Sequence, residues 1–306
     1  MKRAVMTGAT GAIGTALIRE LVSCGTEILV LVRKKSMRIR NIPENPLITI
    51  KYCDLDVLGN IENDTGKKYD VFYHLAWDGT YGSDRNDLYL QNGNIKYSLD
   101  AVGAAKRFGC HTFIGAGSQA EYGRVNGVIR PETPTFPETG YGSAKLCAGQ
   151  MTREYAHRVG LRHIWVRILS VYGSEDNPQS MIMSAIEKLS NGETAKFTKG
   201  EQIWDYLYSD DAARAFRLLG EKGMDGKIYV LGSGNARPLA EYIKDIGDML
   251  CGCGKIELGA IPYAPKQVMC LTADISELSN DTGFKPEYTF KQGLSRIFHD
   301  KGIELQ

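Results

Sequence analysis

Residues 7–14, Thr-Gly-Ala-Thr-Gly-Ala-Ile-Gly, decide the fold of this 306-residue chain. They follow an apolar run, Ala4–Met6, that predicts a buried strand, and they lead into apolar positions at helical spacing that predict a helix over Ala12–Ser23. The segment therefore reads as a strand, a glycine turn and a helix.

The three glycines of this turn have different expected uses. Gly8 permits a tight bend, Gly11 lets the backbone approach a pyrophosphate, and Gly14 allows the helix to pack closely on the strand. The phosphates would bind the free N–H groups at the start of the helix. A glycine-rich turn without a ligand is the alternative, and the position directly after a strand disfavours it.

Further strand-like and helical patterns alternate along the chain. The predicted strands are Ala4–Met6, Ile28–Val32, Ile48–Tyr52, Val71–Leu75, Thr112–Ile114 and His163–Ile168, and the predicted helices include Ala12–Ser23 and Asn94–Phe108. This alternation predicts an α/β fold with a parallel, doubly wound sheet. We expect a Rossmann-type domain over 1–172, with segments from about 203–235 returning to it, and a smaller, mainly substrate-binding domain over 173–306.

Tyr141 and Lys145, in the segment Tyr-Gly-Ser-Ala-Lys, are four residues apart at the start of a predicted helix that includes Ser143–Val159. Both side chains would lie on one helix face. An adjacent ammonium group stabilises a phenolate and lowers the pKa of the tyrosine, so Tyr141 would be able to exchange a proton. An ordinary surface pair is the alternative for the isolated motif.

Composition excludes several classes of function. The 37 Lys and Arg residues balance 36 Asp and Glu, so no electrostatic argument favours nucleic acid or an anionic membrane as the main partner. No apolar run has the length of a membrane span, and the fold begins too early for a signal peptide, so we expect a cytoplasmic protein. The seven cysteines fit reduced thiols, and Cys251, Cys253 and Cys270 lack a fourth metal ligand, so no metal is expected.

Together with the glycine turn and the Tyr141–Lys145 pair, five more segments resemble the extended branch of the short-chain dehydrogenase/reductase superfamily, which acts on nucleotide-activated sugars. These segments are HLAW (74–77), GSQAEYG (117–123), RILSVYG (167–173), WDYLYSDDAARA (204–215) and YVLGSGNARPL (229–239). The resemblance covers nearly the whole chain. It implies that Ser118 hydrogen-bonds the reacting oxygen, that Tyr141 is the acid or base, and that Lys145 holds the nicotinamide ribose.

The resemblance also implies a set of cofactor contacts along the carboxyl edge of the sheet. They are Gly8, Thr10, Gly11, Ala12, Ile13, Gly14, Arg33, Lys34, Asp54, Leu55, Leu75, Ala76, Trp77, Asn94, Tyr141, Lys145 and Ile168. Asp54, just after the third strand, resembles the contact to adenine.

Arg33 and Lys34, at the end of the second strand, bear on the choice of cofactor. An acidic residue there reads a free 2′-hydroxyl, whereas basic residues read a 2′-phosphate. Arg33 offers a planar fork and Lys34 a point charge, and no carboxylate follows the strand, so we favour NADP(H) over NAD(H). A solvated basic loop is the alternative.

Departures from the family pattern bear on the reaction. Gln119 and Ala120 follow Ser118 where dehydratases of the family carry an Asp-Glu pair, so elimination of water is not expected. Ser170 and Trp204 stand where epimerases usually have asparagine and arginine, so the substrate contacts, with Ser118 and Gln119, are altered.

Three functions remain after these observations. We favour an NADP(H)-dependent reductase of a nucleotide-linked 4-keto sugar; a nucleotide-sugar 4-epimerase with transient oxidation at C4 is the alternative. A non-catalytic dinucleotide sensor is a second alternative, which the intact Ser118, Tyr141 and Lys145 disfavour. The resemblance also implies a homodimer, with Ala144, Cys147 and Met151 candidates for the interface or for packing on the chain's own sheet.

Overall fold

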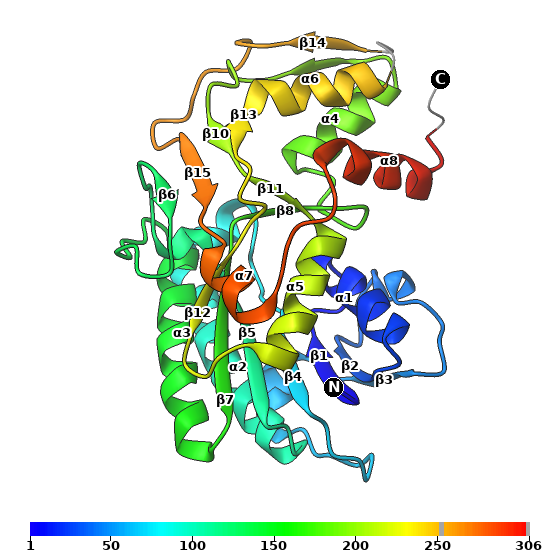
Figure 1. Ribbon diagram of the computed structural model, residues 1–306, viewed down its shortest axis with the longest axis vertical. Helices are drawn as coiled ribbons and strands as arrows, with labels where there is room; N and C mark the ends of the chain where they lie inside the picture. The colour runs from blue at the N-terminus through cyan, green and yellow to red at the C-terminus, as the bar shows by residue number, and fades with distance from the viewer. Residues whose placement is uncertain (251–253, 304–306) are drawn as a thin grey trace.

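A seven-stranded parallel sheet of order β12-β7-β5-β4-β1-β2-β3 lies at the centre of the computed structural model, which describes residues 1–250 and 254–303 (Figure 1). The strands of this sheet are β1 (Arg3–Thr7), β2 (Glu27–Val32), β3 (Ile48–Tyr52), β4 (Val71–His74), β5 (Thr112–Ser118), β7 (Arg162–Ile168) and β12 (Ile228–Leu231). Each neighbouring pair is parallel. The prediction of a doubly wound Rossmann-type α/β fold is confirmed.

Helices cover both faces of this sheet (Figure 1). The long helices on it are α1 (Ala12–Ser23), α2 (Leu88–Arg107), α3 (Gly140–Val159) and α5 (Ser209–Lys222). Side chains of α1 and α5 share one apolar cluster with the sheet, and side chains of α2 and α3 share the other. Four 3-10 turns lie between these elements: η1 (Ile39–Asn41), η2 (Leu55–Asn60), η3 (Gly82–Asn86) and η4 (Gln119–Glu121).

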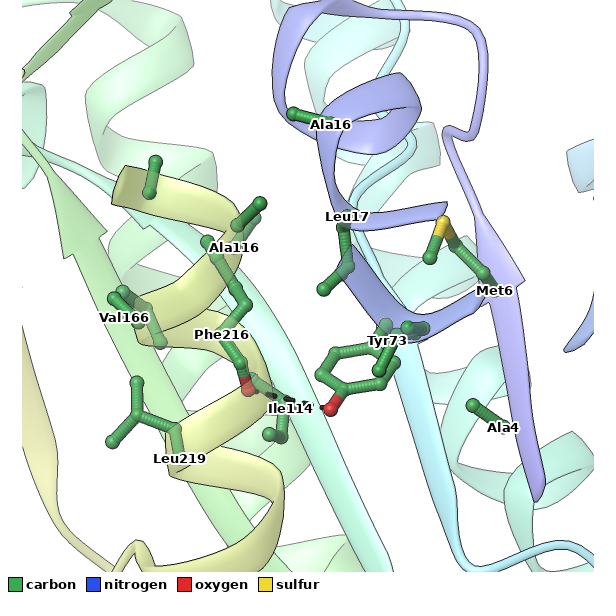
Figure 2. Packing of buried hydrophobic residues seen from close by; sticks show 14 of the residues in the cluster. Ala4, Met6, Ala16, Leu17, Tyr73, Ile114, Ala116, Val166, Phe216 and Leu219 are labelled. Atoms are coloured by element: carbon green, nitrogen blue, oxygen red, sulfur yellow. Dashed lines mark hydrogen bonds between the residues drawn. The ribbon is translucent and has the colours of Figure 1, made fainter. Parts of the chain in front are cut away.

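The alternation of side chains along β1 explains why both faces are apolar. Ala4 and Met6 belong to the cluster under α1 and α5, whereas Val5 belongs to the cluster under α2 and α3. Figure 2 shows the first cluster, in which the Tyr73 hydroxyl donates a hydrogen bond to the carbonyl oxygen of Phe216 at 3.3 Å. Each fully buried Val, Leu, Ile, Phe or Met side chain contributes roughly 1.5–3 kcal/mol to the free energy of folding.

Capping residues set the helix starts that periodicity alone misplaces. Helix α2 begins at Leu88, six residues before the predicted start at Asn94, because the Asp87 side chain accepts hydrogen bonds from the N–H groups of Tyr89 and Leu90. Thr139 caps α3 in the same way, through the N–H of Gly142. The starts of α2 and α3 therefore depend on a side chain outside the apolar repeat of each helix.

Strand β5 continues to Ser118, four residues beyond the predicted end at Ile114, through two glycines that carry no apolar signal. A Cβ atom at Gly115 or Gly117 would collide with the indole of Trp165 on β7, and one at Gly149 on α3 would lie 2.7 Å from the same indole. Trp165 thus fills a slot that three glycines leave open. The slot lets α3 and β7 approach β5 directly beneath Ser118.

The later part of the chain forms a smaller layer and also returns to the large sheet. Tyr172, Ile186, Ile246 and Leu294 are among the residues of its own apolar cluster. The short strand β6 (Val128–Ile129), from earlier in the chain, pairs with β15 (Cys270–Ala273). The remaining elements of the later part are β8 (Ser170–Tyr172), α4 (Met181–Ser190), β9 (Thr194–Lys196), β10 (Ile203–Trp204), β11 (Tyr206–Tyr208), β13 (Arg237–Pro238), α6 (Leu239–Met249), β14 (Lys255–Glu257), α7 (Ser276–Thr282) and α8 (Phe290–Lys301). Within the described ranges, no helix has both the length and the apolar character needed to cross a bilayer. A domain boundary at residue 172 stays a prediction.

Candidate active site

The glycine turn lies where the strand order of the sheet reverses. Strands β1 and β4 are neighbours, and the chain continues outward from β1 on one side and from β4 on the other. Ligands of open α/β sheets bind in the crevice at this point, outside the carboxyl ends of the strands. Gly8 has a φ of +76°, and a Cβ atom there would lie 2.5 Å from the backbone nitrogen of Ala76. Only glycine fits between the ends of β1 and β4.

The other two glycines of the turn differ in their surroundings: Gly14 packs tightly against the backbone, whereas the surface at Gly11 is open to a ligand. A Cβ atom at Gly14 would collide with the carbonyl oxygen of Gly8, whereas one at Gly11 would have only that oxygen near it, at 4.0 Å. Helix α1 begins at Ala12 without a side-chain cap, so the first amides of α1, including those of Ala12 and Ile13, have no side-chain partner. An open Gly11 surface beside uncapped amides is the geometry that a pyrophosphate requires.

Asn41 holds the middle of the turn from outside. Its side-chain amide donates to the carbonyl oxygen of Thr10 at 3.2 Å and to the Glu175 carboxylate at 2.5 Å. Thr10 is therefore fixed through its backbone, and η1 is tied to the segment after β8.

Arg33, at the end of β2, forms an ion pair with an acidic residue from a different part of the chain. Its Nη1 atom lies 3.3 Å from Oδ1 of Asp78, which follows β4; the Arg33 side chain is largely exposed and that of Asp78 is partly exposed. No carboxylate follows β2 directly in the sequence, but Asp78 supplies one from the segment after β4, because β2 and β4 flank β1 and their carboxyl ends lie on either side of it. The ion pair thus reaches across the end of β1.

The remaining predicted contacts at this end have mixed surroundings. Asp54 accepts a hydrogen bond from the backbone N–H of Lys34 at 3.1 Å, which joins the ends of β2 and β3. Leu55 is 8% exposed and packs in the apolar cluster with Leu29 and Leu31. Leu75 is partly buried against the opposite cluster.

Two buried amides of α2 fix the loop after β4. Asn94 exchanges two hydrogen bonds of 2.9 Å with the backbone of Asp78. Gln91 accepts from Nε1 of Trp77 at 2.8 Å and donates to the carbonyl oxygens of Gly79 and Asp84 at 2.8 and 2.9 Å. The predicted contact Asn94 is thus engaged with this chain's own backbone, and the loop is held in one shape.

Ser118, Tyr141 and Lys145 meet at the carboxyl end of β5. Ser118 ends β5 opposite Ile168 of β7, and its Oγ accepts a hydrogen bond from the N–H of Ala120 at 3.2 Å. Lys145 Nζ donates to the carbonyl oxygen of Ala116 at 2.6 Å and lies 5.8 Å from the centre of the Tyr141 ring. The three residues are at most 9% exposed.

Burial shifts both ionisable groups of this trio. It lowers the pKa of Lys145 to about 7, against a smaller opposing effect of Glu121. It also raises the pKa of Tyr141, while Ser118 and the charge of Arg85 act to lower it. The expected lowering of the Tyr141 pKa by Lys145 is therefore wrong, because loss of solvation outweighs the charges around the phenol.

Glu121 and Arg167 form a buried ion pair beneath Ser118, and sequence reasoning missed both. Arg167 Nε lies 2.7 Å from one oxygen of Glu121. The other oxygen accepts from the N–H of Ser118 at 2.8 Å and from Nε1 of Trp165 at 2.9 Å. The carboxylate thus has partners on both oxygens and fixes the backbone of Ser118. The available signal was a charged residue, Glu121, only three residues after the end of a glycine-containing strand.

Arg85, on η3, was also missed. Its Cζ atom lies 4.3 Å from the centre of the Tyr141 ring. Trp77 approaches the same phenol edge-on, with ring centres 6.0 Å apart and planes at 82°. No sequence motif marks Arg85, because the contact is made by a loop far from Tyr141 along the chain.

The predicted substrate residues lie on the side of the later elements. Gln119 begins η4, and Ser170 begins β8 and pairs with Tyr206 of β11. Trp204, on β10, packs against the cluster that contains Tyr122 and Leu169. Its Nε1 is buried and lacks a hydrogen-bond partner among the described residues. An indole N–H without a partner is an unused donor on this side of the site.

The candidate interface residues and the cysteines that were weighed as metal ligands are less informative. Ala144 is buried, Cys147 is partly buried and Met151 is 44% exposed, so one face of α3 packs inward and the other reaches solvent. Cys251 and Cys253 lie outside the described residues. Across 1–250 and 254–303, no cluster of three or more His, Cys, Asp or Glu side chains is arranged to hold a metal.

The fold and the glycine turn at its switch point define a Rossmann-type α/β protein. A model of the NAD dependent epimerase/dehydratase family matches residues 4–232, so the chain belongs to this family. The dTDP-glucose 4,6-dehydratase of Haemophilus influenzae is 24% identical over 331 residues, covering 96% of each chain. This membership confirms the expected resemblance and the prediction of an NAD(P)-dependent enzyme.

Two solved structures share the fold over their whole length. The UDP-glucose 4-epimerase of Thermotoga maritima with UDP-glucose has a TM-score of 0.87 at 22% identity, covering 99% of this chain and 100% of that one. RMD from Pseudomonas aeruginosa complexed with NADPH has a TM-score of 0.82 at 21% identity, covering 98% of both chains. Identities this low establish the common fold alone.

Proposed function

We propose that the protein is an NADP(H)-dependent reductase that converts the 4-keto group of a nucleotide-activated sugar to a hydroxyl, with Tyr141 as the acid. The convergence of Ser118, Tyr141 and Lys145 at the carboxyl end of β5 carries this proposal. Gln119 and Ala120, directly after Ser118, supply no second acid or base, which supports hydride transfer over elimination of water.

The environment of Tyr141 suits the reducing direction. Reduction of a ketone forms a C–H bond at C4 and an O–H bond at the carbonyl oxygen, and the second needs a protonated donor. Because burial raises the pKa of Tyr141, the phenol carries its proton at neutral pH. Ser118 would donate a hydrogen bond to the same oxygen and hold it near the phenol.

The cofactor would lie across the carboxyl edge of the sheet. The N-terminal amides of α1 and the open surface of Gly11 fit its pyrophosphate, and Lys145 fits the hydroxyls of its nicotinamide ribose. When bound, the reduced nicotinamide supplies the hydride. Arg33 and the adjacent Lys34 support a preference for the 2′-phosphate of NADPH, for which Arg33 would exchange its partner Asp78.

The side of the site formed by Gln119, Ser170 and Trp204 would receive the substrate. Trp204 offers a buried N–H without a partner, and a phosphate or sugar oxygen would satisfy it. The family's dehydratase in Haemophilus influenzae is named for dTDP-glucose and the Thermotoga maritima epimerase contains UDP-glucose, which supports a nucleotide-linked sugar here.

Turnover of NADPH with nucleotide-linked 4-keto sugars tests the proposal. The probes are dTDP-, UDP- and GDP-linked 4-keto-6-deoxyhexoses, each supplied by a 4,6-dehydratase, with NADPH absorbance at 340 nm as the readout. We expect stoichiometric loss of NADPH with at least one probe and its near absence in Tyr141→Phe, which should keep cofactor affinity. No turnover with any probe, for a protein that binds NADPH, would contradict the proposed reduction.

Epimerisation is the second candidate, and the Arg33–Asp78 ion pair favours it. A guanidinium that keeps its carboxylate partner does not read a 2′-phosphate, which suits a retained NAD. The same Ser118, Tyr141 and Lys145 would then oxidise C4 and return the hydride to the opposite face. Interconversion of UDP-glucose and UDP-galactose, or of their N-acetyl forms, without net cofactor turnover would support this reading over reduction.

A further inference from the structure

Arg85 provides a fixed positive charge against the face of Tyr141. Its Cζ atom is 4.3 Å from the ring centre, which is closer than Lys145 Nζ at 5.8 Å. The Arg85 side chain is half-buried, and no carboxylate in the described part of the chain lies within 4.0 Å of its nitrogens. Its Nη1 donates to the carbonyl oxygen of Thr80 at 2.9 Å, which keeps the charge in place without neutralising it.

The backbone around Arg85 is fixed from two sides. Gln91, which is 1% exposed, donates to the carbonyl oxygen of the preceding Asp84. The Asn86 side chain accepts a hydrogen bond from the N–H of Gly140, at the start of α3, at 3.3 Å. A Cβ atom at Gly140 would lie 3.3 Å from the carbonyl oxygen of Arg85, so the turn and the helix meet in close contact. The position of Arg85 over Tyr141 is thus built into the fold.

Charge considerations separate the roles of Arg85 and Lys145. A guanidinium stays protonated throughout the range in which proteins fold, whereas burial lowers the pKa of Lys145 to about 7. Above that pH, Lys145 no longer supplies a full charge. A cation on the ring face attracts a phenolate more strongly than a phenol, because the phenolate carries a full negative charge.

We propose that Arg85 is a positioning residue that stabilises the phenolate of Tyr141 as this residue gives up its proton. The inference deepens the proposed function, since it concerns the same acid. In the reducing direction the O–H bond of Tyr141 breaks, the proton passes to the substrate oxygen, and the negative charge left on the phenolate is stabilised by the guanidinium of Arg85 over the ring face. The other ionisable groups that face Tyr141 are Lys145, Glu121 and Tyr81.

Ionisation of the residue at position 141 tests this role without substrate or cofactor. We would incorporate 3,5-difluorotyrosine at position 141 alone, because its phenol is more acidic than that of tyrosine, and follow its titration by ¹⁹F NMR. The variants are Arg85→Gln, Arg85→Met and Arg85→Lys. Arg153→Gln, on the outer face of α3, gives the same change of net charge away from the site.

We expect the midpoint to rise by about one pH unit or more in Arg85→Gln and Arg85→Met, the size that an opposite charge at this range produces. Arg85→Lys should fall between these variants and the parent, and Arg153→Gln should leave the midpoint unchanged. An unchanged midpoint in either charge-removing variant that keeps its folded ¹⁹F spectrum would overturn the proposal. The assay contains no sugar, so a failure of the proposed reduction leaves this result intact.

Discussion

Lys145 Nζ lies 3.7 Å from the centre of the Trp77 ring, so an indole face covers the ammonium group. The same atom donates a 2.6 Å hydrogen bond to the carbonyl oxygen of Ala116. The ring and the carbonyl take the place of water around the charge. They compensate for lost solvation only in part, and burial therefore lowers the pKa of Lys145 to about 7.

The buried ammonium makes stability depend on pH in a defined direction. Between about 7 and 10.5, the unfolded chain holds a proton on Lys145 that the folded chain releases. Stability therefore rises with pH across this window, and the cost of the buried charge is fully present below it. Lys145→Met should gain most over wild type at pH 6 and little at pH 10. Urea denaturation at both values measures this, and a pH-independent difference would contradict it.

Gly8 and Gly11 should respond differently to the same added methyl group. At Gly8, alanine needs a positive φ and would collide with the backbone of Ala76, so we expect Gly8→Ala to lose roughly 3 kcal/mol or more of stability. At Gly11 the space is open, so Gly11→Ala should fold within about 0.5 kcal/mol of wild type and lose cofactor affinity at least tenfold. Thermal melts and fluorescence titration with NADPH separate the two effects. Normal cofactor binding by Gly11→Ala would exclude a pyrophosphate at this surface.

Glu121 and Arg167 should show strong energetic coupling. Glu121→Ala leaves the guanidinium of Arg167 buried without its partner, which costs about 3–5 kcal/mol. Adding Arg167→Met should restore part of that loss, because the uncompensated charge is gone. A double-mutant cycle in urea gives the coupling energy. Additive losses would show that the two charges act independently.

Asp78 should compete with the cofactor for Arg33. Asp78→Asn frees the guanidinium, and because exposed ion pairs are worth about 0–1 kcal/mol, we expect NADPH to bind up to about fivefold more tightly, with NADH unchanged. Calorimetric titration with both cofactors is the measurement. Asp84→Asn makes the same charge change in the same loop as a control. If Asp78→Asn tightened the binding of NADH as much as that of NADPH, Arg33 would not contact the 2′-phosphate.

The parts of the fold that local pattern determines could be predicted from the sequence. Helix α1 has its predicted bounds, Ala12–Ser23. Both ends are visible locally, because the apolar repeat begins directly after the glycine turn and covers the whole helix. Strand β5 was predicted too short, because Gly115 and Gly117 give up apolar side chains to make room for Trp165, which follows much later in the chain.

The residues of the site divide in the same way. Ser118, Tyr141 and Lys145 stand in short motifs and lie together as expected. Arg85 touches Tyr141 only because Gln91 shapes a loop, and Arg33 meets Asp78 only because β1 lies between their strands. Such contacts depend on the assembled sheet. The net pKa shift of Tyr141 depends on burial, which the sequence motif does not report.

Strand β12 completes the edge of the sheet and helix α5 covers one of its faces, and both are synthesised after the other six strands. A chain that has emerged from the ribosome only as far as residue 172 holds six of the seven strands, but the outer edge of β7 is unpaired and the face destined for Phe216 and Leu219 is bare. Residues 173–231 follow at about 5–20 residues per second, so this state lasts roughly 3–12 s. During synthesis the nascent chain therefore exposes an unpaired strand edge and an apolar surface. Chaperones bind such surfaces, and other chains can pair with such an edge and aggregate.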